Sequence, residues 1–171
     1  MSVLVIATAA AVLLWAVIWF NRLVRLRSFC GNAWSRIEVL LQRRHELVPV
    51  LADTVRAYAV HERDLLDGVA EARAKAIAAS SLDAASELEP RLEERLGGLL
   101  AVAERYPGLE ADAVFLDLQE RLVAIEDELR FARQFYNDTA MKYNTALSVF
   151  PGAIVAGIAG FPPAPYFMMR S

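Results

Sequence analysis

The chain has 171 residues, of which 56% are hydrophobic and 23% charged, and its net charge is −3. Phosphate contacts need a basic surface, so this mildly acidic composition argues against a nucleic-acid binder. Because there is a single cysteine, an internal disulfide is excluded, and we expect Cys30 to be an ordinary buried thiol.

The N-terminal segment predicts a membrane anchor. Residues 1–21 carry no charged side chain, and Val3 to Phe20 are apolar except for Thr8. A helix of that apolar length reaches about 27 Å, which matches the hydrocarbon thickness of a bilayer. A cleaved signal peptide is the alternative, but the segment lacks a basic start and its apolar run is too long. We therefore expect a single transmembrane anchor at residues 1–21.

Aromatic and basic residues end this segment and predict its orientation. Aromatic side chains favour the membrane interface, and arginines stay on the cytoplasmic side. The pattern predicts an N-terminus outside the cell membrane and a cytoplasmic C-terminal domain. Ala7 and Ala11 form a small face, from which self-association is expected. The predicted anchoring residues are Trp15, Trp19, Phe20, Arg22, Arg25 and Arg27.

Residues 22–150 show the hydrophobic period of helices and predict one bundle domain. A continuous apolar stripe follows the anchor, with a kink expected at Pro49 because proline removes a backbone donor. Residues 79–90 predict a loop or a weak helix start, and Pro107-Gly108 predicts a turn. The last helix is expected to run from near Leu109 to Pro151-Gly152.

The fold class expected from this pattern is all-α, with no strand. Short connections favour antiparallel neighbours, so the anchor should precede an up-and-down bundle of three to four helices. Charges at helical spacing predict exposed ion pairs of Glu71 with Lys75 and of Glu126 with Arg130.

No catalytic, metal or cofactor site is predicted. His45 and His61 are each followed by glutamate, but on one helix they lie about 24 Å apart, which is too far for shared coordination. Neither matches the two-histidine zinc motif, and no phosphate-binding loop occurs. Both histidines are therefore interpreted as ordinary polar residues of the helices.

The C-terminal third offers the best interaction surface. Tyr136 and Tyr143 are seven residues apart and share one helix face, either as core tyrosines bonded to backbone or as a docking stripe. Residues 151–171 predict an apolar tail rich in proline and glycine, packed on the bundle or in contact with a partner. The expected interaction residues are Tyr136, Tyr143, Phe161, Tyr166 and Phe167.

Several ordered blocks resemble the LemA family across nearly the whole chain. The resemblance implies a membrane anchor followed by a four-helix bundle. A helix break near Pro49 or His61 would reconcile four helices with the three or four that the pattern predicts. The resemblance carries over no catalytic activity, and it implies a membrane-bound zinc protease as one kind of protein partner. The blocks are AWSRIEVLLQRRHELVPVLADTVRAYAVHE (33–62), LLAVAERYPGL (99–109), FLDLQERL (115–122), ARQFYNDTAMKYN (132–144) and FPGAIVAGIAGF (150–161).

Together these observations predict a non-catalytic, single-pass membrane protein. Its cytoplasmic bundle is expected to act as an interaction or scaffolding module. A membrane-tethered sensor, in which an apolar ligand displaces the tail, is one alternative. A hydrolase that uses His61 with neighbouring carboxylates is the other.

Overall fold

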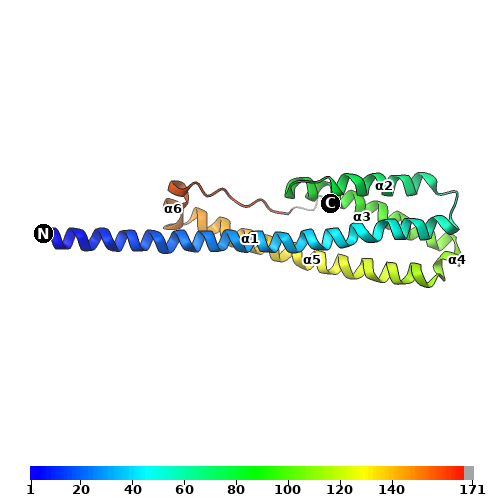
Figure 1. Ribbon diagram of the computed structural model, residues 1–171, viewed down its shortest axis with the longest axis horizontal. Coiled ribbons are helices and arrows are strands. Elements are labelled where there is room, and N and C mark those ends of the chain that lie inside the picture. The colour runs from blue at the N-terminus through cyan, green and yellow to red at the C-terminus, as the bar shows by residue number, and fades with distance from the viewer. Residues whose placement is uncertain (168–171) are drawn as a thin grey trace. The chain divides into compact units, whose positions relative to one another are not determined.

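The computed structural model describes residues 1–167, so residues 168–171 of the predicted tail lie outside the described part. The described chain contains helices and no strand, which confirms the predicted all-α class. Figure 1 shows the elements in chain order. They are α1 (Ser2–Tyr58), α2 (Arg63–Ile77), α3 (Leu82–Ala101), η1 (Val102–Arg105), α4 (Pro107–Glu110), α5 (Ala113–Ser148) and α6 (Gly152–Ala159).

The chain divides into two compact units. Unit 1 comprises residues 1–35 and 134–166, and unit 2 comprises residues 36–133 with Phe167. Both α1 and α5 contribute one part of their length to each unit. The α1 helix contains an apolar stretch that is long enough to cross a membrane, with none of that stretch buried inside the protein.

Unit 2 is a four-helix bundle made from the end of α1, α2, α3 and the start of α5 (Figure 1). Each helix presents an apolar stripe to one core, because leucine, valine and alanine recur at three- and four-residue spacing. Leu51, Val55, Leu92 and Leu99 are fully or almost fully buried there. The core therefore confirms the predicted bundle and its stripe.

The first break in the helices lies near His61 and not at Pro49. The α1 helix continues through Pro49 to Tyr58, and α2 begins at Arg63. Proline leaves the carbonyl four residues earlier without its helical donor. Here Arg73 Nε donates to that carbonyl, on His45, at 2.7 Å. A side chain from α2 thus supplies the hydrogen bond that Pro49 cannot make.

Of two further predicted boundaries, the helix start within residues 79–90 is found and the turn at Pro107-Gly108 is corrected. Within residues 79–90 the chain is already helical from Leu82, because the Ser81 hydroxyl accepts from the backbone N–H of Ala84 at 3.2 Å and caps α3. Pro107-Gly108 opens the short helix α4 and is not a plain turn.

The last long helix begins at Ala113, four residues beyond the expected start near Leu109. Asp112 determines this start. Its Oδ1 accepts from the backbone N–H groups of Val114 and Phe115 at 2.9 and 3.0 Å, which is the contact of a helix N-cap. The Tyr58 hydroxyl donates to the other oxygen of Asp112 at 2.8 Å.

The predicted apolar tail contains a helix. The α5 helix ends at Ser148, and α6 follows over Gly152–Ala159. Gly160 ends α6 in the left-handed conformation, with φ +70°, which glycine adopts without steric penalty. In unit 1, Val155 and Ala156 of α6 pack with Leu23 and Trp19 of α1. The C-terminal segment therefore folds back onto α1.

Candidate functional site

A cluster of charged side chains lies inside the bundle of unit 2. Arg44 on α1 is fully buried, and Glu89 on α3 is 1% exposed. One terminal nitrogen of Arg44 donates to Glu89 Oε2, and the other donates to Glu126 Oε1 on α5. His45 Nε2 lies 2.8 Å from the second Glu89 oxygen. This cluster therefore connects three of the four helices.

The charges of the cluster stabilise one another. Burial raises the pKa of the Glu89 carboxyl, but the hydrogen bond to His45 and the charge of Arg44 outweigh burial and hold that pKa below its ordinary value. Burial lowers the pKa of Arg44, and the charges of Glu126 and Glu89 more than compensate, so its pKa is raised. Both groups consequently stay ionised at neutral pH, as a buried pair must when its geometry is good.

Arg133 on α5 completes the surroundings of the cluster. Its guanidinium is buried and lies 5.0 Å from the centre of the Phe167 ring. Burial, followed by the charge of Arg44, lowers the pKa of Arg133, while the charge of Glu126 opposes this change. Glu93 on α3 lies 3.9 Å from Arg44 as well, so three glutamates surround the two arginines.

This arrangement is suited to locking helices together. Both oxygens of Glu89 contact Arg44 or His45, and each terminal nitrogen of Arg44 has a carboxylate partner. The Arg44 Nε is buried without a hydrogen-bond partner among the described residues. Within residues 1–167, no group of three or more histidine, cysteine, aspartate or glutamate side chains has the arrangement of a metal site.

The sequence-based interpretation missed the partners of Glu126. It predicted a pair with Arg130, but Arg130 instead bonds to Asp127 at 2.5 Å, and Glu126 pairs with Arg44. The other predicted ion pair, Glu71 with Lys75, forms at 2.6 Å. The sequence did contain a signal for the cluster, because three charged residues occupy core positions of their helices. Each lies four residues after one buried apolar residue and three or four residues before another. They are Arg44 (after Leu40, before Val48), Glu89 (after Ala85, before Leu92) and Glu126 (after Leu122, before Leu129).

His61 lies apart from the cluster. It is exposed in the connection between α1 and α2, where the neighbouring Glu62 pairs with Arg105 at 3.0 Å. His45, by contrast, is largely buried against Glu89. The structure therefore does not bring the two histidines together, and the polar site of the bundle contains His45 and not His61.

In unit 1, three side chains of α5 hold the C-terminal tail by its backbone. The Tyr136 hydroxyl donates to the carbonyl of Pro165 at 2.7 Å, and the Tyr143 hydroxyl donates to that of Pro162 at 2.9 Å. Asn144 donates to the carbonyl of Ala164 and accepts from its N–H, both at 2.9 Å. We refer to Tyr136, Tyr143 and Asn144 as the tail clamp. Its bonds go to backbone, so the tyrosine stripe is occupied by the protein's own tail.

The other predicted interaction residues occupy different environments. Phe161 contacts the Phe20 ring edge-on at a centroid distance of 5.5 Å. Tyr166 is 42% exposed, whereas Phe167 is buried and belongs to unit 2. Burial raises the pKa of the Tyr143 hydroxyl, which matches its place under the tail.

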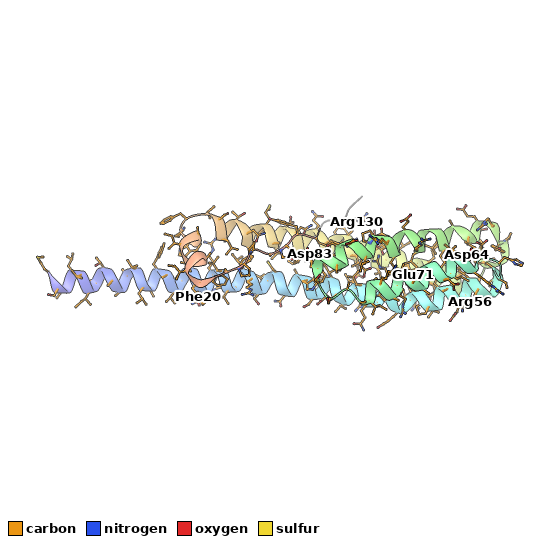
Figure 2. All side chains as sticks on the ribbon, turned by 90° about the horizontal axis from the view of Figure 1, so that it is seen from above. Phe20, Arg56, Asp64, Glu71, Asp83 and Arg130 are labelled. Atoms are coloured by element: carbon orange, nitrogen blue, oxygen red, sulfur yellow. The ribbon has the colours of Figure 1, made fainter. Side chains whose placement is uncertain are left out.

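The predicted anchoring residues all lie on α1. Trp15 contacts Phe150 at a centroid distance of 6.1 Å, and Trp19 packs in the small core with Val155 and Ala156. The Arg22 guanidinium lies 4.4 Å from the centre of the Trp19 ring. Arg25 and Arg27 are exposed. Figure 2 shows Phe20 on α1 in unit 1, close to the C-terminal segment.

Comparison with known proteins places these features in a family. The model of the LemA family matches residues 33–171. The chain is 24% identical to magnetosome protein MamQ 2 of Paramagnetospirillum magneticum, covering 88% of this chain and 65% of that protein. It is 23% identical to magnetosome protein MamQ of Magnetospirillum gryphiswaldense, over 86% of this chain and 64% of the relative.

A third relative carries the family name. The chain is 26% identical to protein LemA of Metamycoplasma hominis, over 76% of this chain and 60% of that protein. In each case the chain spans less than two thirds of the curated relative's length.

Proposed function

Because the chain belongs to the LemA family, we propose that it is a membrane-anchored interaction module without catalytic activity. The apolar part of α1 is the anchor, and the bundle of unit 2 is the module that contacts protein partners. The arginines after the anchor favour an outside N-terminus and a cytoplasmic bundle. A membrane-bound protease, the partner implied by the family resemblance, belongs to this proposal.

The observation that carries the proposal is an exposed apolar row on α5 in unit 2. Leu116, Val123 and Phe131 are 49%, 55% and 67% exposed. Their spacings of seven and eight residues place them on one face of the helix, away from the core residues Phe115 and Leu122. We refer to these three residues as the α5 outer row.

Single exposed hydrophobic residues are common on protein surfaces, but a row at helical spacing is the pattern by which helices dock on each other. Phe131, the largest of the three, contacts Arg130 at 5.8 Å from its ring centre. Phenylalanine and arginine are both enriched at protein interfaces relative to the rest of the surface. The outer row is therefore the surface on which a helical partner would dock.

The buried charge cluster supports the same proposal. Its carboxylates are engaged by Arg44 and His45, so they serve the bundle's structure and are not free for acid-base chemistry. A polar hollow between α2 and α3 is lined by other residues, among them Glu71, Lys75, Arg91 and Glu94.

Crosslinking in intact cells tests the proposal. The full chain would carry a photoreactive phenylalanine analogue in place of Phe131, and a matched chain would carry it in place of the exposed Asp67 on α2. We expect a defined covalent adduct at position 131 that is absent at position 67. The adduct should weaken when Val123 is also replaced by aspartate. Equal labelling at the two positions, or no adduct at 131, would contradict the proposal.

A further inference from the structure

The C-terminal part of unit 1 has an unusually apolar surface. From Tyr143 to Met169 the sequence contains no aspartate, glutamate, lysine or arginine. Within this stretch Phe150 is 77% exposed, Ile154 51% and Ile158 85%. Contiguous apolar surface of this kind marks a contact with a partner or a membrane.

The location of α6 beside the apolar stretch of α1 favours the membrane over a protein partner. A cavity of about 290 Å³ lies between α1 and α6, lined by Leu13, Ala16, Val17 and Phe20 of α1 and by Val155 and Ile158 of α6. Leu13 and Phe20 span about 10 Å along the helix axis. The short helix therefore lies beside the last two turns of the apolar stretch and reaches past the arginines toward the centre of the anchor.

We propose that α6 and the turn before it enter the hydrocarbon of the leaflet at the Arg22 end of α1. The partner of the exposed side chains of Phe150, Ile154 and Ile158 is then the acyl chains of lipid, and one acyl chain fills the cavity. This inference rests on the proposed membrane crossing by α1, because the two apolar surfaces are continuous.

The length of α6 determines the mode of entry. Eight residues of helix extend about 12 Å, which is less than half the hydrocarbon thickness of a bilayer. The segment therefore enters and leaves through the same leaflet. The chain comes in along α5, turns at Phe150 and Pro151, and returns through α6 to the tail clamp.

Several backbone N–H groups of this segment are bonded within the protein, as a lipid environment requires. Inside a bilayer, backbone polar groups need partners within the protein. The Val149 N–H donates to Thr145 and the Ala153 N–H to Val149, both at 3.0 Å. At the other end of α6, the N–H groups of Gly160 and Phe161 both donate to the Ala156 carbonyl, at 2.9 and 3.1 Å. Pro151, which lies between Val149 and Ala153, has no N–H that needs a partner.

Lipid-borne quenchers test the proposal in the full chain. Cys30→Ala removes the native thiol, and single cysteines are then introduced at Ile158, at Val12 in the anchor and at the exposed Asp67 of α2. Each is labelled with an environment-sensitive NBD dye and reconstituted into phosphatidylcholine vesicles that contain doxyl-labelled lipid. We expect a blue-shifted emission that is quenched by the lipid label at Ile158 and Val12, and neither effect at Asp67.

The outcomes separate this inference from the proposed anchor. Quenching at Val12 without quenching at Ile158 would overturn the inference and leave the anchor intact. Absence of quenching at Val12 would overturn both. A blue-shifted but unquenched dye at Ile158 would mean that protein and not lipid covers α6. The same measurement at Ile154 guards against a local disturbance by the label at Ile158, and lipid quenching is expected there too.

Discussion

At the scale of single residues, the most informative side chains are charged groups in core positions. Arg44, Glu89 and Glu126 occupy helix positions where apolar residues would be expected. Removing one partner of a buried ion pair leaves an uncompensated charge, which destabilises a protein strongly. Exposed pairs such as Glu71 with Lys75 contribute little, because water screens both charges.

Glu89→Ala tests this difference. At neutral pH we expect the free energy of unfolding to fall by about 3 to 5 kcal/mol, because Arg44 stays buried with one of its two bonded carboxylates missing. Glu71→Ala is the control and should leave stability nearly unchanged. Chemical denaturation of the full chain in detergent micelles gives both values. Similar losses in the two variants would contradict a structural role for the cluster.

The pH dependence of stability follows from the lowered pKa of Glu89. In the unfolded chain this carboxyl has its ordinary pKa of about 4.5, and in the folded chain its pKa is lower. The unfolded state therefore binds the proton first as pH falls, so the stabilisation is present above the ordinary pKa and is lost through the lower folded one. In Glu89→Gln this acid-dependent loss should be smaller than in the parent, as measured by denaturation at a series of pH values.

At the scale of elements, the turn between α5 and α6 depends on close backbone approach. A Cβ atom at Gly152 would lie 2.0 Å from the carbonyl oxygen of Ala146, which is far inside van der Waals contact. Gly157, in the middle of α6, has no atom within 4 Å of the corresponding position. Both glycines belong to α6, but only position 152 lacks room for a side chain.

Gly152→Ala should therefore displace α6 from α1, whereas Gly157→Ala should be tolerated. Alanine in a helix interior is favoured over glycine by about 0.5 to 1 kcal/mol, so the second variant is expected to be neutral or slightly stabilising. Limited proteolysis of the full chain in micelles with a protease of broad specificity, read at the bonds after Val149 and Ile158, measures the displacement. Equal protection of both variants would show that the turn does not need glycine at position 152.

At the scale of the whole molecule, one chain combines an apolar segment that can cross a membrane with a bundle that contains almost all the charge. Residues 1–21 are uncharged, and all acidic and basic side chains lie beyond them. Arg22, Arg25 and Arg27 mark the boundary. Because arginines near a membrane segment remain on the cytoplasmic side, the bundle is expected in the cytoplasm.

Reporter fusions after Ser171 test that orientation. A fluorescent protein that matures only in the cytoplasm should be active, and alkaline phosphatase, which needs an oxidising compartment, should be inactive. Replacing Arg22, Arg25 and Arg27 together by glutamine should weaken this preference, since it removes the charge asymmetry. An active phosphatase on the parent chain would reverse the proposed topology.

The sequence by itself determined the fold class, the apolar N-terminal helix and the stripe of the bundle. These depend on hydrophobic period and on runs of apolar residues, which act over a few neighbouring positions. It also placed Tyr136 and Tyr143 on one face of a helix. Local rules were less successful at boundaries, where Pro49 and Pro90 lie inside helices that continue through them.

Only the tertiary structure decided which distant groups meet. Arg44 and Glu126 are 82 positions apart along the chain, and Tyr136 lies 29 positions before Pro165. Arg73 likewise comes from another helix to bond the carbonyl that Pro49 leaves open. Sequence spacing constrains contacts within one helix but not between helices, because the latter depend on how the helices pack. The charge cluster, the tail clamp and the return of α6 to α1 are therefore properties of the folded chain.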